Sequence, residues 1–314
     1  SLGLHVAQFY DKVLDIRRCH LHEERLNSVR NRLREIARRD NVPFYDIREQ
    51  TGLLRNLVFR SSAATGEVML LLIIAEDDPV LIDHLFGELR AEFPFITSWV
   101  WMVNPKKNDA YAELPWRVWD GPAVITEELG GYRFRISPTA FFQTNSGQAE
   151  QLYATVRGMI DGPAEVLYDL YCGTGTLGIF CAGKAERVVG LEYVEAAVTD
   201  ARENAALNAL PNASFFAGDL KKLLNERFVA ANGQPEVVLT DPPRAGMAEE
   251  VVRELIRLAP RQIIYVSCKP ASQARDLALL QEAYEVAAVQ PVDMFPHTAH
   301  IENVLSLRRR AAAG

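Results

Sequence analysis

The stretch Val166–Thr176, VLYDLYCGTGT, constrains the fold of this chain more than any other. Its first half is apolar or favours β-strands, and its second half alternates glycine with small hydroxyl residues. This pattern is typical of a buried parallel strand that turns sharply into a helix. Gly173 and Gly175 let the backbone approach a bound molecule closely, and open α/β sheets bind ligands at the carboxyl ends of their strands. We therefore expect a ligand-binding turn here.

The glycine spacing does not by itself identify the ligand, because Gly173, Gly175 and Gly178 also match a dinucleotide fingerprint by letter. Acidic residues in and after the predicted strands favour a cationic ligand over a pyrophosphate. S-adenosylmethionine, with its sulfonium and ammonium groups, is therefore the expected cofactor, and the acidic residue after the second strand suits its ribose diol. The acidic residues are Asp169, Glu192, Asp219 and Asp241.

Residues 136–314 are expected to form an α/β catalytic domain, because strand patterns alternate with helix patterns. Seven strands in this layout suit the Rossmann-like sheet of the class I SAM-dependent methyltransferases. The expected strands are Val166–Tyr171, Arg187–Leu191, Ser214–Phe216, Val237–Thr240, Gln262–Ser267, Tyr284–Val292 and Val304–Leu307, with helices at Ser146–Ile160, Ala196–Leu207, Met247–Leu258 and Ala271–Glu282.

Residues 1–135 are expected to form a smaller α+β domain that would face RNA but whose sequence alone reveals no function. Pro115–Gly121 is expected to be a loop, and Gly130-Gly131 a hairpin turn. The expected helices are Leu21–Arg39 and Pro79–Phe93, and the expected strands are Leu54–Ser61, Glu67–Ala75, Ile96–Asn104, Ala123–Glu128 and Tyr132–Ile136.

The net charge of −7 argues against binding of nucleic acid by bulk electrostatics alone, because such binding neutralises phosphates with Lys and Arg. Eight arginines nevertheless crowd one short region. They form either a solvated helix face, balanced in part by nearby glutamates, or an RNA-facing surface. They are Arg17, Arg18, Arg25, Arg30, Arg32, Arg34, Arg38 and Arg39.

Cytoplasm is the expected compartment. No apolar run approaches the roughly eighteen residues of a membrane-spanning helix, and the start SLGLHVAQFYDK lacks the layout of a signal peptide. The four cysteines, Cys19, Cys172, Cys181 and Cys268, show no CxxC pair and no disulfide-like framework, which agrees with a reducing compartment.

Four further motifs identify a family. Together they resemble the RNA uracil-C5 methyltransferases, which make 5-methyluridine in bacterial 23S rRNA and in tRNA. The resemblance covers about residues 132–308, with the motifs in the same order. The motifs are FFQTN at 141–145, DPPR at 241–244, VSCKP at 266–270 and HIENV at 300–304.

The chemistry of uracil agrees with this resemblance. C5 of uracil is too weak a nucleophile to attack a sulfonium methyl group, so a thiolate must first add at C6. Cys268, just after a predicted strand, is the expected nucleophile, and Glu302 is the family-matched base that removes the C5 proton. Cys172 and Cys181 are expected to be buried scaffold residues.

The resemblance also implies a set of cofactor-binding residues. Asp219 has a structural alternative, because a residue after a strand can simply cap the next helix. Arg244 either contacts RNA phosphate or holds its loop, and His297 and His300 are expected to be structural, since no third metal ligand has suitable spacing. The implied set is Gln143, Tyr171, Gly173, Gly175, Thr176, Glu192, Asp219 and Asp241.

Two departures from the family pattern stand out. Lys269 occupies a position where relatives usually carry Asn; an ammonium that points inward there would lower the pKa of Cys268. Many members that act on 23S rRNA begin with a β-barrel and carry four cysteines for an iron–sulfur cluster. Cys19 resembles only the last of these, so we expect an N-terminally truncated chain with no intact cluster and no metal.

The expected function is therefore that of a SAM-dependent RNA (uracil-5-)-methyltransferase acting on 23S rRNA, with tRNA as the alternative substrate. A catalytically weak RNA-binding fragment is a further alternative. The RNA cytosine-C5 class is disfavoured, because it needs a cysteine beside the prolines of Asp241–Arg244. RNA is the expected partner, with a flipped-out uridine, no DNA, no membrane, and a monomeric protein.

Overall fold

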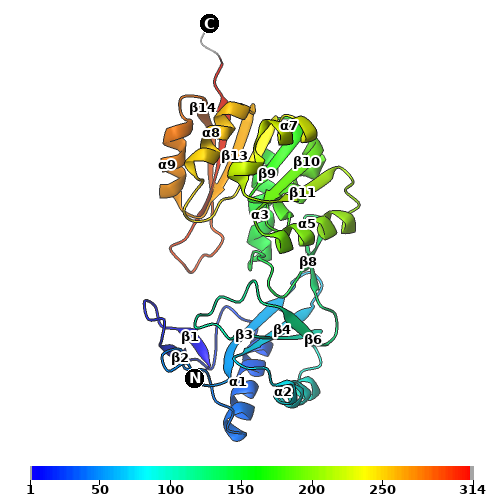
Figure 1. Ribbon diagram of the computed structural model, residues 1–314, viewed down its shortest axis with the longest axis vertical. Coiled ribbons are helices and arrows are strands. Elements are labelled where there is room, and N and C mark those ends of the chain that lie inside the picture. Colours follow the sequence, from blue (N-terminus) through cyan, green and yellow to red (C-terminus); the bar gives the residue numbers. More distant parts are fainter. Residues whose placement is uncertain (1, 312–314) are drawn as a thin grey trace. The chain divides into compact units, whose positions relative to one another are not determined.

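The computed structural model describes residues 2–311, which fold into two compact units (Figure 1). Unit 1 comprises Ser1–Thr126 and Ile136–Thr139, and unit 2 comprises Glu127–Arg135 and Ala140–Gly314. The chain therefore crosses between the units three times, at 126/127, 135/136 and 139/140. The sequence predicted a single division, after residue 135. Within residues 2–311 no helix combines the length and apolar character of a membrane span.

Unit 1 is an α+β unit built on a four-stranded sheet in the order β3-β4-β5-β6, in which only the central pair is parallel. Apolar residues at helical spacing in α1, such as Val29, Leu33 and Ile36, are buried in its core. The elements are β1 (Gly3–His5), β2 (Val13–Asp15), α1 (Glu24–Arg39), β3 (Leu54–Ser61), β4 (Val68–Ile74), α2 (Pro79–Glu92), β5 (Ser98–Val103) and β6 (Trp116–Asp120).

The prediction of a loop at Pro115–Gly121 is wrong, because Trp116–Asp120 forms strand β6. This strand pairs antiparallel with β5 at the edge of the sheet. The Arg117 guanidinium lies over the Trp101 ring, 4.6 Å from its centre, so the side chains also join the two strands. A proline and a glycine flank the strand, and their turn-forming character hides it in the sequence.

Most of the arginines around α1 lie against carboxylates or are buried. Arg30 and Arg34 are each only 5% exposed, and the Arg34 Nε lies 2.9 Å from Asp15 Oδ1. Most of the remainder are also paired, so the structure favours the balanced helix face over an RNA-facing surface. The other pairs are Arg18–Glu24, Arg25–Glu23, Arg32–Glu35, Arg32–Glu88, Arg32–Glu92, Arg38–Asp15, Arg39–Asp40 and Arg39–Glu88.

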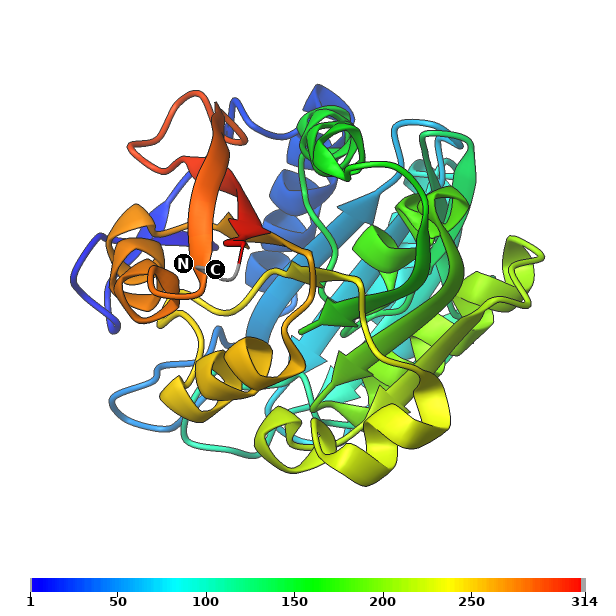
Figure 2. The same ribbon diagram turned by 90° about the horizontal axis from the view of Figure 1, so that it is seen from above.

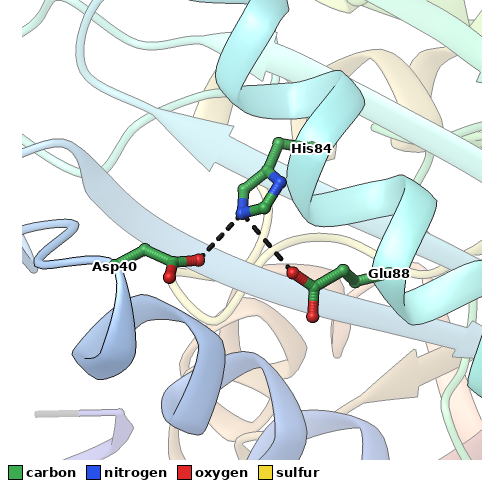
Figure 3. Close-up of side chains that lie close together, drawn as sticks. All are labelled: Asp40, His84 and Glu88. Atoms are coloured by element: carbon green, nitrogen blue, oxygen red, sulfur yellow. Dashed lines mark hydrogen bonds and ion pairs between the residues drawn. The ribbon is translucent and has the colours of Figure 1, made fainter.

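An ion-pair network joins the end of α1 to α2 (Figure 3). His84 Nε2 lies 2.8 Å from Asp40 Oδ2 and 3.5 Å from Glu88 Oε1. Arg39 pairs with both of these carboxylates, and Arg32 lies 3.3 Å from Glu88. The Arg39 and His84 hydrogen bonds hold the pKa of Asp40 well below its usual range. The network fixes the two helices against each other.

Unit 2 is a seven-stranded sheet in the order β11-β10-β9-β12-β13-β15-β14, as predicted for a class I methyltransferase fold. All pairs are parallel except those of β15 with β13 and β14. The strands are β9 (Ala164–Leu170), β10 (Ala185–Glu192), β11 (Ala213–Ala217), β12 (Val237–Thr240), β13 (Gln262–Ser267), β14 (Tyr284–Val292) and β15 (Glu302–Arg309).

Helices cover both faces of this sheet, so its strands are buried and continuously apolar. One face packs against α3, α4 and α5, and the other against α6 to α9; Figure 2 shows α3 and α8 on opposite sides. The helices are α3 (Ser146–Met159), α4 (Thr176–Phe180), α5 (Glu195–Leu207), α6 (Leu220–Leu223), α7 (Glu226–Asn232), α8 (Glu249–Leu258) and α9 (Pro270–Leu280), with a 3₁₀ turn at Ala182–Lys184.

The hairpin of β7 (Ile125–Leu129) and β8 (Tyr132–Ile136) contributes to the core of unit 2. Its turn is Gly130-Gly131, as predicted, with φ of 56° and 86°. A Cβ on Gly130 would lie 2.3 Å from the Phe180 ring, so only glycine fits this contact. This packing explains why most of the hairpin belongs to unit 2.

Candidate active site

The glycine-rich turn begins where β9 ends, and its backbone is left-handed at several positions. Tyr171, Gly173 and Gly175 have φ of 59°, 52° and 77°, and α4 follows directly. A Cβ on Gly173 would meet nothing within 4 Å, so the turn is open on that side. The Gly173 N–H donates to Glu192 Oε2 at 3.1 Å. The turn and the end of β10 therefore form one rigid edge.

The third glycine of the fingerprint serves an interior carboxyl group. The Gly178 N–H donates to Asp169 Oδ2 at 2.8 Å, and a Cβ on Gly178 would lie 2.8 Å from the same oxygen. Asp169 is 1% exposed, and burial raises its pKa to about 7 despite that hydrogen bond. The sequence marks Asp169 as acidic but gives no sign that it anchors the start of α4.

Strand register brings Cys268 and Glu302 to the same edge of the sheet. In the antiparallel pair β13 and β15, Ser267 lies opposite Asn303, so the next residue outward on each strand is Cys268 and Glu302 respectively. Asp241 follows β12, the parallel neighbour of β13. Residues predicted from separate motifs thus converge.

Two carboxyl groups at this edge, those of Glu302 and Asp241, are held toward their neutral forms. Burial raises the pKa of Glu302 to about 7. Burial, and then the charges of Glu302 and Asp169, raise the pKa of Asp241 to about 8. Within residues 2–311, Asp169, Glu192, Asp241 and Glu302 form no salt bridge with Lys or Arg. A set of carboxyl groups that lack a cationic partner fits a ligand that carries positive charge, and it does not fit a pyrophosphate.

Cys268 is half-buried, whereas Cys172 and Cys181 are buried. Burial, and then the Glu302 charge, raise the pKa of the Cys268 thiol, and Arg244 opposes this shift. Lys269, the next residue in the chain, is exposed. The cation that favours the thiolate is therefore Arg244 of the DPPR motif.

Glu192, Asp219 and Thr176 lie at or near the ends of β10 and β11 or at the start of α4, and they differ in their contacts. Glu192 also accepts a hydrogen bond from the Val194 N–H at 3.0 Å, so both of its carboxylate oxygens are engaged by backbone. Asp219 accepts from the Lys221 N–H and caps α6, the structural alternative noted above. Thr176 is 8% exposed, with its hydroxyl 3.0 Å from that of Thr174. Gln143 is half-buried ahead of α3.

Tyr171 directs its side chain toward the opposite face of the sheet from the α3 helix. It packs among the apolar residues that contact α8, and burial raises the pKa of its phenol to about 12. Its backbone, with the positive φ, is the part that shapes the turn.

Cys19 lies outside this site, in unit 1. Its backbone N–H and carbonyl are both bonded to the Asn27 side chain, at 2.8 and 3.1 Å. In the part of the chain that the structure describes, the one group of three metal-ligand side chains is Asp40, His84 and Glu88 (Figure 3). It is largely exposed, and the Arg39 guanidinium already neutralises its carboxylates.

Sequence reasoning missed three polar residues on the inner face of α9. Ser272, Gln273 and Asp276 are at most 6% exposed and lie directly after the VSCKP motif. The only signal in the sequence is that polar letters occupy positions where an amphipathic helix should be apolar.

Comparison with known proteins adds independent findings. The sequence profile described as tRNA (Uracil-5-)-methyltransferase matches residues 128–310. An "Uncharacterized RNA methyltransferase" of Porphyromonas gingivalis is 46% identical, and the match covers 98% of this chain and 67% of the relative. A protein of the same description from Bacteroides thetaiotaomicron is 45% identical over 99% of this chain and 69% of its own length.

A solved structure is similar over almost the whole chain. It is the Pyrococcus abyssi tRNA (uracil-54, C5)-methyltransferase in complex with S-adenosyl-L-homocysteine. The two are 32% identical with a TM-score of 0.82, and the match covers 97% of this chain and 72% of that one. The similarity therefore includes unit 1 as well as unit 2.

Proposed function

This chain belongs to the tRNA (uracil-5-)-methyltransferase family, and we propose that it forms 5-methyluridine in RNA through a covalent adduct between Cys268 and uracil. It is a SAM-dependent RNA methyltransferase. The observation that carries the proposal is the β13–β15 register, which sets Cys268 beside Glu302 at the sheet edge that also bears the glycine-rich turn.

S-adenosylmethionine fits the open side of the turn and the unneutralised carboxyl groups, and it supplies an electrophilic methyl group when bound. We assign the ribose hydroxyls to Glu192 and the region of the adenine to Asp219. Asp241 is assigned to the methionine end or to the uracil. The remaining members of the proposed binding set are Gln143, Tyr171, Gly173, Gly175 and Thr176.

In the proposed mechanism, Cys268 first loses its proton and its thiolate adds to C6 of uracil. The C5–C6 double bond opens, and its electron pair gives C5 the character of a carbanion. This carbon would take the methyl group from the bound donor, whose methyl–sulfur bond would break with its electron pair left on sulfur, so that S-adenosylhomocysteine would leave. Arg244 acts on the charge of the thiol before this step, because it counters the burial that keeps the thiol protonated.

Glu302 completes the reaction. Its carboxylate takes the proton from C5, the C5–C6 double bond re-forms, and the C6–S bond breaks to return the Cys268 thiolate. The pKa of Glu302, about 7, suits a group that must accept a proton near neutral pH. A uridine inside a helix cannot reach Cys268, so we expect the target base to be flipped out of a loop.

We propose 23S rRNA as the first candidate substrate. Cys19, in IRRCHLHEERL, resembles the last cysteine of the cluster set that occurs in members acting on 23S rRNA. A second candidate is tRNA, favoured by the similarity to the P. abyssi enzyme, which acts on uracil 54 of tRNA.

The test uses an RNA hairpin that contains 5-fluorouridine, together with S-adenosylmethionine, followed by a denaturing gel and peptide mapping. The fluorine cannot leave as a proton does, so the adduct persists. We expect a stable protein–RNA adduct at Cys268, none in Cys268→Ala, and an unchanged adduct in Cys19→Ser, which removes the other half-buried thiol. Absence of the adduct from protein that still binds the methyl donor would overturn the nucleophile assignment.

A second experiment addresses the base. With ordinary uridine RNA, Glu302→Gln is expected to accumulate the methylated covalent adduct, because the amide cannot take the C5 proton. Normal turnover by this variant would show that another residue is the base. Parallel assays with 23S rRNA and tRNA transcripts choose between the substrates. Binding of RNA without methylation of either would instead identify an RNA-binding fragment.

A further inference from the structure

Helix α9 has an unusual buried face. Its buried residues are Ser272, Gln273, Asp276 and Leu280, so three of the four are polar. Burying a polar side chain costs free energy unless it is hydrogen-bonded, and within residues 2–311 each of these three is bonded. Apolar residues would pack this face at no such cost. The bonds that the polar residues make therefore indicate what the face is for.

Gln273 joins β13, which Cys268 follows, to β15, which begins at Glu302. Its amide nitrogen donates to the Tyr265 carbonyl of β13 at 2.9 Å and to the Asn303 carbonyl of β15 at 3.1 Å. Its amide oxygen accepts from Asn303 Nδ2 at 2.7 Å. Gln273 is 2% exposed, so all of its amide groups are satisfied by these two strands.

Ser272 lies between the VSCKP and DPPR motifs. Its hydroxyl is 2.9 Å from the carbonyl oxygen of Lys269, next to the nucleophile, and 2.9 Å from that of Arg244. The hydroxyl carries a single proton and donates to one of these carbonyls at a time. Ser272 thus connects the backbone of Arg244, the cation that acts on the thiol, to the turn that carries Cys268.

Asp276 makes the third connection. Its Oδ2 accepts from the Met247 N–H, after the DPPR motif, and from the Tyr265 hydroxyl of β13, both at 2.7 Å. Its Oδ1 accepts from Arg275 Nε at 2.9 Å, so the buried carboxylate is also neutralised. Together the three side chains bond to every segment that carries Asp241, Cys268 or Glu302.

We propose that α9 is the positioning element of the active site, with Gln273 as the residue that fixes the nucleophile-bearing strand against the base-bearing strand. The proposal rests on the proposed roles of Cys268 and Glu302. Gln273 and its neighbours are positioning residues, because they act on backbone segments and not on substrate. Displacement of reacting groups by about 1 Å is enough to cost about 100-fold in rate, so loosening these bonds should slow the chemistry.

The central test is Gln273→Glu, measured in methylation assays with saturating RNA and S-adenosylmethionine. The carboxylate keeps the size of the amide and can still accept from Asn303, but it cannot donate to the Tyr265 and Asn303 carbonyls. We expect kcat to fall about 10- to 100-fold while KM for both substrates stays within about twofold. The rate of adduct formation with the 5-fluorouridine hairpin should fall by the same factor.

The matched control is Gln281→Glu, which makes the same chemical change at the exposed end of α9 and should leave kcat unchanged. Ser272→Ala is a second variant, to be used if Gln273→Glu does not fold. It should lower kcat about threefold or more without changing the affinity for S-adenosylmethionine.

A double variant tests whether the amide pair acts as a unit. Gln273→Ala and Asn303→Ala remove the two partners, and we expect the double variant to lose no more activity than the worse single one. Wild-type kcat in both Gln273→Glu and Ser272→Ala would overturn the proposal. The proposal would also be overturned if the loss of kcat were accompanied by equally large losses of affinity for S-adenosylmethionine or of folded protein, because either result indicates a merely structural role. Failure of the proposed function is distinct, because wild-type protein would then form no 5-methyluridine or Cys268→Ala would remain active.

Discussion

Two ionisable residues at the sheet edge set the same requirement on pH. Glu302, with a pKa of about 7, must be deprotonated to accept the C5 proton, and Cys268, whose pKa is raised by burial, must lose its proton to attack. Both requirements favour high pH. We therefore expect the single-turnover rate of 5-methyluridine release to rise from pH 6 to pH 9, with a first inflection near pH 7 that is absent from the rate of methylated-adduct formation in Glu302→Gln. A rate that falls between pH 7 and pH 8.5 would contradict this assignment.

At the scale of single residues, the sequence predicted which side chains meet at the sheet edge better than it predicted what surrounds them. Cys268, Glu302 and Asp241 stand in recognisable motifs, and the structure brings them to one edge. The inner face of α9 was not predicted, because Gln273 has partners on two different strands, 8 and 30 residues away in the chain. Likewise, nothing local in the sequence shows that Lys269 is exposed and leaves Arg244 beside the thiol.

Helix α4 can lie close to β9 because Gly178 has no side chain. A Cβ at position 178 would lie 2.8 Å from Asp169 Oδ2 and 3.3 Å from a Val188 methyl group. Gly178→Ala should therefore lower the free energy of unfolding by about 1–3 kcal/mol and weaken binding of S-adenosylmethionine, since α4 carries the glycine-rich turn. Urea unfolding and calorimetry measure the two effects.

The control for that substitution is Gly158→Ala, in the exposed part of α3, where a Cβ meets nothing within 4 Å. It should raise stability by about 0.5–1 kcal/mol, because glycine is unfavourable inside a helix. Equal effects of the two substitutions would show that the contact with Asp169 does not limit the packing of α4.

The ion-pair network between α1 and α2 predicts a stability effect that depends on salt. Glu88 accepts from Arg39 and Arg32 and lies 3.5 Å from His84 Nε2, so Glu88→Gln removes the negative charge that these side chains share. We expect the melting temperature to fall at low ionic strength and the difference from wild type to shrink in 1 M salt, because exposed charges are screened. A difference that is unchanged by salt would mean that packing, and not charge, links the helices.

Secondary structure was predictable in long elements with regular apolar spacing and not in short elements. Helix α1 and strand β3 follow from their apolar spacing, and Leu54–Ser61 coincides with the predicted strand. The edge strand β6 was mistaken for a loop because its residues are half exposed and it lies between turn-forming residues. The short helices α6 and α7 escaped prediction because four to seven residues give too little periodicity.

For the molecule as a whole, the raised carboxyl pKa values predict how stability varies with pH. Asp169, Asp241 and Glu302 titrate near pH 7, 8 and 7 in the folded protein, against about 4 in an unfolded chain. The folded state therefore binds more protons between these limits, and their contribution to stability is lost as the pH rises through the folded pKa values.

We accordingly expect the melting temperature of the ligand-free protein to fall between pH 5 and pH 8. Asp241→Asn should flatten this dependence, because the amide has no proton to lose. Glu150→Gln, on the exposed side of α3, should leave the slope unchanged. A melting temperature that rises over the same interval would show that these groups are ionised in the folded state.

The seven strands of unit 2 and the family were predictable from the sequence, because the alternation of strand and helix patterns and the order of the motifs can be read along the chain. The division into units was not, because it depends on which core the β7–β8 hairpin joins. Contacts such as that of Gly130 with Phe180 are visible only in three dimensions.

That division has a genetic consequence. Because residues 127–135 belong to unit 2 and residues 136–139 to unit 1, neither unit is encoded by one uninterrupted segment. A single recombination event between two relatives would therefore always leave at least one unit a hybrid of the two parents. A chimaera in which each unit comes whole from one parent needs junctions at 126/127, 135/136 and 139/140, so the two units are expected to be inherited together.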